Sequence, residues 1–373
     1  MVDGSSLQCV RTRSIELLQV RKTFLWAFLS SIKRSFLFTQ GGEKMVFVYF
    51  LLAAAITVYA AIKLSTYADV MTEKSKMGGM LVGTVLLAGA TSLPEVTTSI
   101  SAVMIDNPDI AIGNMLGSNL FNIFILAMFD LYFRQKQLFN YASRDHLYTA
   151  GLGLLLTVTT LIALIVRVDM TFIGIGVDAL LIAILYGIGI YYIGKQPTEP
   201  VAEHEVEEEV VVGKYEEITL KRAVFGFIIA AIVIMAAGTA LSITGDQIAV
   251  VTGLGSSFVG SFLIAASTSL PEAVAVFMAL KLRNVNLAFG SILGSNIFNM
   301  LIIAMSDVFY RNGSILADVS TSHLVSAVGI TILSILVMYS VLRQNVTSKV
   351  RYVIPSLLVV VVYFVSSYLI FIG

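Results

Sequence analysis

The chain has 373 residues, of which 57% are hydrophobic and only 13% charged, and its 24 Lys and Arg balance its 24 Asp and Glu. With a mean hydropathy of +0.88, this composition is typical of polytopic membrane proteins and excludes an ordinary soluble domain. A net charge of zero gives no indication of nucleic-acid binding, and we expect none. The single cysteine, Cys9, excludes an intramolecular disulfide and a thiolate metal cage.

Residues 1–44 form a basic N-terminal extension with seven Lys or Arg and only one short apolar run, 24–29. This run is too short to span a bilayer and no small-residue cleavage site follows it, so we do not expect a signal peptide. Three interpretations stay open: a basic amphipathic segment at the membrane surface, a disordered tail, or sequence upstream of a true start at Met45.

From Met45 onward, apolar stretches of about 20 residues predict an all-α polytopic membrane protein with ten transmembrane helices. The expected spans are about 45–64, 79–104, 109–129, 147–166, 170–193, 222–244, 253–280, 285–309, 319–342 and 351–372. Five precede the central loop and five follow it, which predicts a first five-helix repeat over 45–193 and a second over 222–373. Because five is odd, the second repeat is inverted relative to the first, as in many secondary transporters.

The predicted linker between the halves, 194–221, is acidic and contains eight glutamates. Such like-charge runs are usually disordered, and no EF-hand spacing occurs, so we expect a solvated linker rather than a calcium sensor. Loops after odd-numbered spans carry 15 Lys or Arg, whereas loops after even-numbered spans carry only Arg167 and Arg311. The positive-inside rule therefore predicts a protein of the cell membrane with a cytoplasmic linker and both ends of the ten-span core outside.

An internal repeat at an offset of 177 residues is the strongest feature of the sequence. Residues 83–130 align with 260–307 without a gap, and 22 of the 48 pairs are identical. GTVLLAGATSLPE (83–95) matches GSFLIAASTSLPE (260–272), and GNMLGSNLFN (113–122) matches GSILGSNIFN (290–299). A repeat of this kind predicts two homologous halves.

Each copy of the repeat interrupts apolar segments with residues that break a helix. Pro94 and Pro271 each remove a backbone donor, and the Gly-Ser-Asn motifs 117–119 and 294–296 permit close approach or unwinding. Non-helical backbone at membrane depth is tolerated only where it lines a cavity or is buried in protein. The breaks therefore predict a polar site between the two copies.

Glu95 and Glu272 occupy identical repeat positions inside predicted spans. An intramembrane carboxylate is costly unless it is paired or hydrated, which favours a functional role. Ca²⁺ prefers carboxylate, backbone carbonyl and amide oxygens. The further candidate ligands of that type are the carbonyls of Thr91 and Thr268 and the amides of Asn122 and Asn299. No His or Cys is nearby in the sequence, which argues against zinc or copper and leaves Ca²⁺, Na⁺, H⁺ and Mg²⁺.

Other interpretations of these residues exist. A lone buried glutamate can be a protonated helix contact, and a run of small residues can serve close helix packing. The duplication of Glu, Thr-Ser and Gly-Ser-Asn on opposed halves favours a binding site. Asp178 has no equivalent in the tenth span and is interpreted as a polar residue near the outer interface rather than an ion relay. We expect Asp130 and Asp307, at span ends, to orient loop residues or line a vestibule.

The paired motifs resemble the two alpha repeats of the cation/calcium exchanger superfamily, and the chain from Met45 to Gly373 looks most similar to prokaryotic sodium/calcium exchangers. The resemblance implies an antiporter that exchanges Ca²⁺ for Na⁺ by alternating access. It implies Ca²⁺ contacts from Thr91, Glu95, Thr268 and Glu272, with Asn122 and Asn299 beside the central site. It also implies Na⁺ contacts from Ala88, Ser92, Ser118, Ala265, Ser269 and Ser295.

The expected mechanism has a fixed core of four repeat helices across which the long first and sixth spans slide or tilt. Ca²⁺ and Na⁺ would compete for the same two glutamates, so that the empty, doubly charged core is too costly to reorient. Beyond the transported ions and the lipid bilayer, we expect no cofactor and no obligate protein partner.

Asn299 is the one departure from the resemblance that matters, because sodium-coupled relatives often carry Asp there. An exchanger of Ca²⁺ or another divalent cation for H⁺ is therefore the alternative. The proton-coupled branch usually shows Gly-Asn-Ala-Thr-Glu-like signatures rather than Thr-Ser-Leu-Pro-Glu, which keeps Na⁺ first. A cation channel is less favoured, because channels usually gather identical subunits around a pore. We expect no enzyme, because no HExxH, paired catalytic aspartates or GxSxG occurs.

Overall fold

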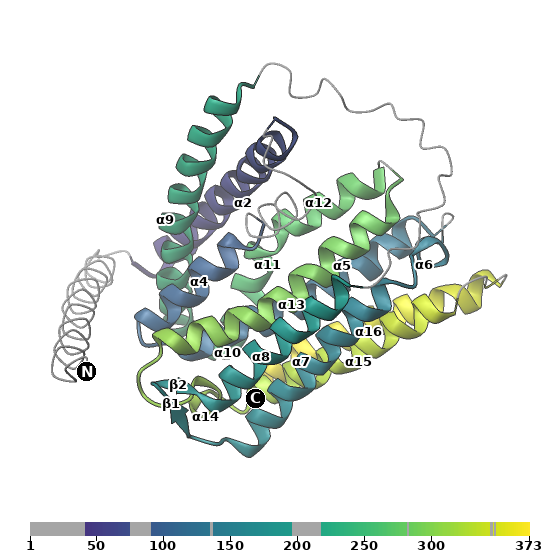
Figure 1. Ribbon diagram of the computed structural model, residues 1–373. Coiled ribbons are helices and arrows are strands. Elements are labelled where there is room, and N and C mark those ends of the chain that lie inside the picture. The colour runs from purple at the N-terminus through teal and green to yellow at the C-terminus, as the bar shows by residue number, and fades with distance from the viewer. Residues whose placement is uncertain are drawn as a thin grey trace, which may run out of the picture.

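The computed structural model describes residues 42–74, 91–134, 137–195, 218–281, 283–343, 346 and 348–373, which are almost entirely helical (Figure 1). The N-terminal extension up to residue 41, the start of the second predicted span and most of the central linker lie outside these residues. The elements of the first half are α2 (Gly42–Lys74), α4 (Leu93–Met104), α5 (Pro108–Tyr132), α6 (Leu138–Tyr141), α7 (His146–Val166), β1 (Thr171–Phe172), β2 (Ile175–Gly176) and α8 (Val177–Ile193). Those of the second half are α9 (Leu220–Thr252), α10 (Ser256–Phe258), η1 (Val259–Ile264), α11 (Ala265–Thr268), α12 (Leu270–Lys281), α13 (Val285–Phe309), α14 (Ile315–Asp318), α15 (Ser322–Leu342) and α16 (Lys349–Ile372).

The helix boundaries repeat along the chain at the offset of the sequence repeat. Adding 177 to the bounds of α5, 108 and 132, gives 285 and 309, the bounds of α13. Adding 177 to the bounds of α4 and of the four-residue α6 likewise gives the bounds of α12 and α14. The bounds of α9 are those of α2 plus 178, and the bounds of α15 are those of α7 plus 176. Local structure therefore repeats well beyond the 48 residues in which the sequences align.

α5 and α13 are the central helices. Within their most apolar membrane-length stretches, 89% and 67% of the residues are buried, compared with at most 44% in the other candidate spans. The two helices run antiparallel. The chain after α13 returns to the start of α5, where Ser320 donates its backbone N–H to Asp109. The chain after α5 reaches the start of α13 in the same way, where Ser143 donates its backbone N–H to Asn286.

The two longest helices, α2 and α9, have 33 residues each and lie side by side (Figure 1). At about 1.5 Å per residue each is about 50 Å long, well beyond the roughly 30 Å of a hydrocarbon core, so they must tilt or project from it. Small buried residues such as Ala61 and Ala230 pack between them, and Gly226 lies against the ring of Tyr67. Small residues allow membrane helices to approach closely. The expected long, unbroken first and sixth spans are thus present.

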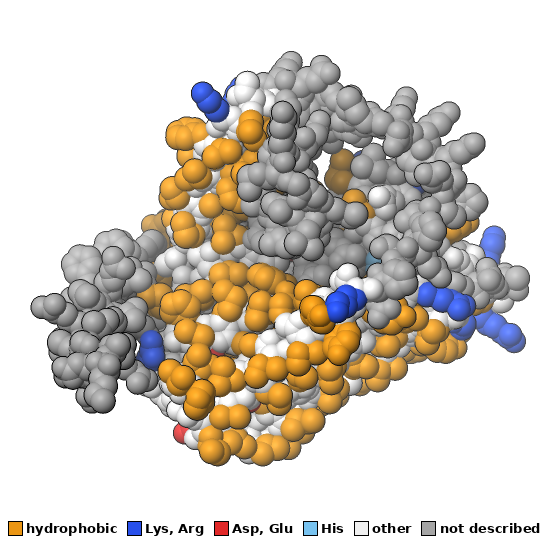
Figure 2. All heavy atoms as spheres, in the orientation of Figure 1, with side chains coloured by type: hydrophobic (Ala, Val, Ile, Leu, Met, Phe, Trp, Pro, Cys, Tyr) orange, Lys and Arg blue, Asp and Glu red, His pale blue; other side chains and the backbone are white. Residues whose placement is uncertain are grey.

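Seven described helices are long and apolar enough to cross a membrane, and the bent pair 256–268 and 270–281 makes an eighth if it counts as one span. α8, with 17 residues, is a shorter apolar helix. Hydrophobic side chains cover most of the described surface in Figure 2, whereas Lys and Arg gather mainly toward its edges. A surface of this kind suits contact with lipid rather than water. The chain is therefore a multi-pass membrane protein.

Three predicted span boundaries are wrong. Residues 170–176 do not belong to the fifth helix, because β1 and β2 form an antiparallel hairpin and α8 begins only at Val177. Ile173 and Gly174, between these strands, have φ values of 56° and 77°, which suit a tight hairpin turn and not a helix. The first span continues past Leu64 to Lys74, and the sixth continues past Thr244 to Thr252, where Asp246 and Gln247 are buried in the protein.

Candidate functional site

The two helix breaks have the same local backbone. α11 ends at Thr268 and α12 begins at Leu270, with a bend of 43° between the segments. Ser269 at this break has φ −88° and ψ 1°, and the equivalent Ser92, directly before α4, has φ −92° and ψ 6°. Both values lie in the sparsely populated bridge region, where many active-site residues are found. Pro94 and Pro271 fall in the first turn of the following helix, where a missing N–H breaks no helical bond.

A six-residue π-helix, η1, precedes the break in the second half and was not expected from the sequence. π-helical turns are rare and frequently lie at functional sites. η1 leads directly into Ala265, which is buried and begins α11 three residues before Thr268. The equivalent Ala88 lies outside the described residues.

Glycines bring α5 into close contact with η1. A Cβ on Gly113 would lie 2.9 Å from the carbonyl oxygen of Ser257, and one on Gly117 would clash with the backbone of Ser261. Only glycine allows the two backbones to approach this closely. Close packing is therefore a role of these two glycines. It also buries the neighbouring Ser118, whose hydroxyl has no hydrogen-bond partner among the described residues.

Glu95 and Glu272 are buried together between the halves. Their side chains are 0% and 1% exposed, and they are close enough to interact electrostatically. Thr268 and Ser269 are hydrogen-bonding neighbours of Glu95, and the Ser269 hydroxyl donates to Glu95 Oε1 at 3.5 Å. The Oε2 atoms of both Glu95 and Glu272 are buried without a hydrogen-bond partner in the described part of the chain. Two buried carboxylates without a compensating cation are strongly unfavourable.

Four asparagines form a reciprocal network between α5 and α13. The Asn122 amide N–H donates to Asn296 Oδ1 at 2.9 Å, and the Asn299 amide N–H donates to Asn119 Oδ1 at 3.0 Å. Asn119 and Asn296 also donate to each other's backbone carbonyls, at 3.1 and 3.4 Å. These bonds fix the amide nitrogens of Asn122 and Asn299. Their Oδ1 atoms are left buried with no donor among the described residues.

Most of the predicted contacts are buried in the helices that form this centre. Thr268 and Ser269 are fully buried, Thr91 and Ser92 are 7% and 2% exposed, and Ser295 is 9% exposed. The helices that carry the glutamates, α4 and α12, pack against α5 and α13, which carry the asparagines. The structure thus joins Thr268 and Ser269 to Glu95 through hydrogen bonds, with Glu272 close enough to Glu95 to interact electrostatically. It joins Asn122 and Asn299 through the asparagine network.

This arrangement suits a hard cation. Two carboxylate oxygens and two amide oxygens are buried with no hydrogen to accept, and oxygen ligands of these kinds are what Ca²⁺ binds. Neither glutamate forms an ion pair with a Lys, Arg or His of the described residues. The same residues contain no group of three or more His, Cys, Asp or Glu that could hold a metal.

The model of the sodium/calcium exchanger protein family matches residues 45–194 and again 222–372, which together make up most of the chain. The chain belongs to the sodium/calcium exchanger protein family. The chain is also similar to the inner membrane protein YrbG of Escherichia coli (strain K12), at 24% identity over 252 residues that cover 66% of this chain and 74% of YrbG.

Solved exchangers have a similar fold. The crystal structure of the H⁺/Ca²⁺ exchanger CAX matches with a TM-score of 0.59 at 17% identity and covers 94% of this chain and 96% of that one. A structure of the sodium-calcium exchanger NCX_Mj matches with a TM-score of 0.51 at 19% identity and covers 86% and 97%. At such identities the likeness concerns the fold alone.

Two acidic residues of this exchanger outside the site hold short helices in place. Asp307 accepts the backbone N–H groups of Ile315, at the start of α14, and Gly176, at 2.8 and 2.6 Å. The equivalent Asp130 accepts the hydroxyl of Ser356 at 2.6 Å and is bonded to Tyr352 and to the backbone of Leu138 in α6. Both aspartates therefore orient loop residues, which is one of the two roles expected for them.

Asp178 lies near Asp307, because both bond residues close to the start of α14. Its carboxylate accepts the Ser314 hydroxyl at 2.7 and 2.8 Å, just before α14, and the Ala179 backbone N–H at 2.8 Å. It lies in the first turn of α8 and is not part of the buried glutamate site.

Sequence reasoning missed some residues that support the site of this exchanger. Asn119 and Asn296 lie inside the repeated Gly-Ser-Asn motif, three residues before the predicted ligands and so on the same helix face, which was a usable signal. Asn114 and Thr98 carried no such signal, because neither is repeated: their equivalents are Ser291 and Ala275. No residue pattern indicated the π-helix.

Proposed function

We propose that this exchanger is a secondary antiporter that exchanges Ca²⁺ for Na⁺ by alternating access, with the ions bound between the two halves near the middle of the membrane. One observation carries the proposal: four buried oxygens, Oε2 of Glu95 and Glu272 and Oδ1 of Asn122 and Asn299, have no donor among the described residues. A cation bound between the halves would supply such oxygens with the positive partner that no hydrogen bond in the described structure provides.

The remaining ligands are assigned by residue type and burial. The backbone and side-chain oxygens of Thr91 and Thr268 complete the Ca²⁺ shell, and Na⁺ uses Ser92, Ser118, Ser269, Ser295 and the carbonyls of Ala88 and Ala265. The buried, unpartnered hydroxyl of Ser118 supports its assignment. No catalytic chemistry and no cofactor is part of this proposal, since the cations are the substrates.

The architecture we propose is ten transmembrane helices in two inverted five-helix repeats, 45–193 and 222–373, joined by a cytoplasmic linker. The repeated helix bounds and the antiparallel α5 and α13 support the inversion. The excess of Lys and Arg in the loops after odd-numbered spans supports the orientation, which puts the start of α5 on the outer side.

Alternating access in this proposal is a movement of α2 and α9 across the helices that carry the site. These two helices are unbroken and pack against each other through small residues, which favours their movement as one pair. Exchange follows because Ca²⁺ and Na⁺ compete for one pair of glutamates. With both glutamates ionised, the empty site would hold two buried negative charges, and their cost would oppose reorientation without a cation.

A proton-coupled Ca²⁺ exchanger is the second candidate, and Asn299 is the observation that favours it. An amide in place of a third carboxylate leaves less negative charge to bind several Na⁺ ions. Its Oδ1 is one of the four unpartnered oxygens, so the position belongs to the site with either coupling ion. The similarity in fold to an H⁺/Ca²⁺ exchanger is compatible with this candidate.

Uptake of ⁴⁵Ca²⁺ into proteoliposomes distinguishes the two. Vesicles loaded with Na⁺ are compared with K⁺-loaded vesicles across which a pH gradient is imposed, and with vesicles that have neither gradient. Uptake that requires the Na⁺ gradient supports the first proposal, and uptake that follows only the pH gradient supports the second. Uptake that proceeds equally without a counter-ion gradient would contradict both and indicate a channel.

A further inference from the structure

Asn114 lies on α5, is fully buried, and joins three elements around the ion site. Its amide nitrogen donates to the hydroxyls of Thr98 and Ser99 on α4, at 2.8 and 3.2 Å. Its amide oxygen accepts the hydroxyl of Thr268 at 3.1 Å. Thr268 is a proposed Ca²⁺ ligand at the end of α11 in the other half of the molecule. Asn114 is thus a bridge from one half of the exchanger to an ion ligand of the other.

The orientation of the Asn114 amide is determined by its neighbours. The Thr98 hydroxyl donates its own hydrogen to the Pro94 carbonyl at 2.5 Å, so toward Asn114 it can only accept. The amide nitrogen must therefore face Thr98, and the amide oxygen must face Thr268. A reversed amide would put two acceptors against each other in a buried place, which is unfavourable.

The hydrogen of the Thr268 hydroxyl has competing acceptors. A threonine hydroxyl carries one hydrogen and two lone pairs. Within the described residues, Asn114 Oδ1 at 3.1 Å and the Ala265 carbonyl at 3.3 Å can accept this hydrogen, and Glu95 is a further hydrogen-bonding neighbour. A carboxylate is the stronger acceptor, because a charge-assisted bond is roughly twice as strong as a neutral one. Without Asn114, the Thr268 hydrogen would turn toward Glu95.

We propose that Asn114 is a positioning residue for cation binding: it takes the hydrogen of the Thr268 hydroxyl, so that the hydroxyl presents lone pairs, and Glu95 a free carboxylate, to the bound cation. The inference rests on the proposed function, since it assigns Thr268 and Glu95 to the ion site. Asn114 acts through Thr268 and does not itself bind the ion.

The second half of the exchanger has no equivalent of this device. The residues 177 positions after Asn114, Thr98 and Ser99 are Ser291, Ala275 and Val276, so neither the amide nor the two hydroxyls are present. The ion site is therefore symmetric in its glutamates but asymmetric in the groups that set their hydrogen bonds. Asn114→Ser, which introduces the residue of the other half, is the natural variant to test.

The test is Ca²⁺ binding to the purified full chain by isothermal titration calorimetry, together with ⁴⁵Ca²⁺ uptake in proteoliposomes. Asn114→Ser should weaken Ca²⁺ binding and raise the half-saturating Ca²⁺ concentration about tenfold, the effect of one charge-assisted hydrogen bond, with the maximal rate changed less than about twofold. Thr268→Val should have a similar effect. The double variant should be no weaker than Thr268→Val alone, because Asn114 acts through the hydroxyl that is already absent.

Two variants provide matched controls. Asn140→Ser removes an asparagine in α6, and Thr331→Val removes a hydroxyl whose bond is to its own helix, at Ala327. Both should bind Ca²⁺ like the wild type. If Asn114→Ser does not fold, Asn114→Asp is the second variant: its protonated carboxyl can donate to Thr98 in place of the amide and still accept from Thr268, so it should bind Ca²⁺ like the wild type.

Additive effects of Asn114→Ser and Thr268→Val would overturn the inference, as would a lower maximal rate at unchanged binding, or weaker binding by Asn114→Asp. These results differ from a failure of the proposed function. If the wild-type chain neither binds nor transports Ca²⁺, the function is wrong. If it does both and Asn114→Ser is unchanged, only the role of Asn114 is wrong.

Discussion

Around Glu95 and around Glu272, the two halves hold the same proposed ligand residues on the same backbone, with bridge-region serines directly before α4 and α12. The asparagines on α5 and α13 also pair reciprocally. Behind these ligands the halves differ, since the layer of Thr98, Ser99 and Asn114 has no polar equivalent in the second half. The proposed ligands are therefore related by the pseudo-symmetry, whereas the polar groups hydrogen-bonded behind them are not.

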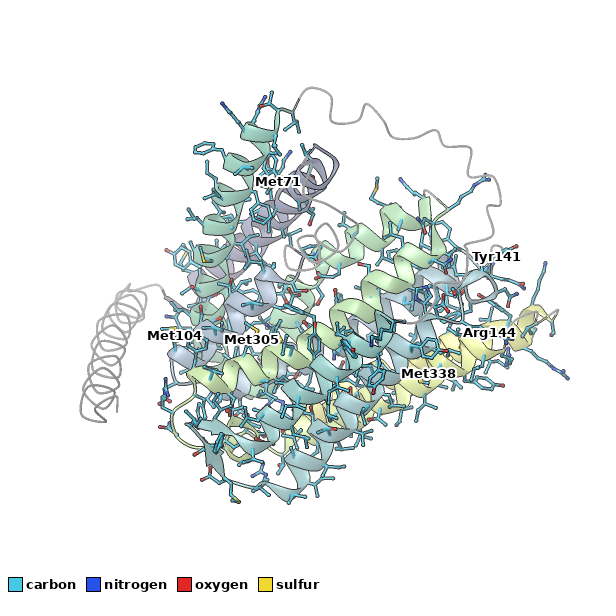
Figure 3. All side chains as sticks on the ribbon, viewed as in Figure 1. Met71, Met104, Tyr141, Arg144, Met305 and Met338 are labelled. Atoms are coloured by element: carbon cyan, nitrogen blue, oxygen red, sulfur yellow. The ribbon has the colours of Figure 1, made fainter. Side chains whose placement is uncertain are left out.

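The two ends of the central helices give a second comparison of the same kind. Asp109 at the start of α5 accepts a hydrogen bond from His323 at 2.9 Å, and Asn286 at the start of α13 is paired with His146 at 3.3 Å. These contacts are equivalent under the repeat, but one pair contains a carboxylate and the other an amide. Figure 3 labels residues near the two ends of α5: Met104 lies just before its start, and Tyr141 and Arg144 lie beyond its end. They are at opposite sides of the molecule.

If the glutamates are equivalent, their removal should have equal consequences, and this is the largest effect we expect. Glu95→Gln and Glu272→Gln should each reduce Ca²⁺ transport at least about 100-fold, because one charged ligand of a buried cation is lost. In Ca²⁺-free buffer at alkaline pH, where the empty wild-type site must hold two buried negative charges, each variant should be more stable than the wild type. Thermal unfolding with and without Ca²⁺ measures the second effect, and Asp145→Asn serves as a control. Transport retained in the double variant would contradict the assignment.

The contact between α5 and η1 should be the most sensitive packing in the described structure. Gly117→Ala puts a methyl group onto the backbone of Ser261, which cannot give way as a side chain could, so we expect a loss of stability above about 3 kcal/mol or failure to fold. Gly113→Ala, 2.9 Å from a carbonyl, should cost less. Gly151→Ala on α7 is the matched control, because no described atom lies within 4 Å of the new methyl. Equal yields of folded protein for the three variants would show that the contact is looser than described.

The sequence predicted the membrane class, the broken helix at Thr268–Leu270 and the burial of both glutamates. Hydropathy and Pro are local signals, and the internal repeat can be found by aligning the sequence with itself. The sequence did not predict the hairpin at 171–176, where an apolar run was interpreted as helix although its glycines favour a turn. Nor did it predict the roles of Asn114 and Thr98. Their significance depends on helices from both halves meeting in space, and a pattern based on repetition overlooks what is not repeated.

The asparagine network should respond equally in the two halves. Asn119→Ala removes the acceptor of the Asn299 amide, and Asn296→Ala removes that of Asn122, and each leaves a buried N–H without a partner. A lost bond of this kind costs about 1–3 kcal/mol. The freed amide can then turn its oxygen away from the site, so Ca²⁺ binding should also weaken, by about tenfold. Calorimetric titration and thermal unfolding of both variants test this. A clear difference between the variants would mean that the reciprocal network is not functionally symmetric.

The smallest effect concerns the two histidine pairs at opposite ends of α5. Asp109→Asn makes the first pair like the second and keeps an acceptor for Ser320 and His323, so only the difference between a charged and a neutral acceptor is lost. We expect a loss of about 1 kcal/mol, and a gain of at most about that size for Asn286→Asp, which places a carboxylate beside His146. Thermal unfolding of the single variants and of the exchanged pair, at one fixed pH and without Ca²⁺, gives both values. If Asn286→Asp instead destabilises the protein, the two ends differ in more than the acidic side chain, and the burial of His146 beside Phe289 is then the feature to compare with His323.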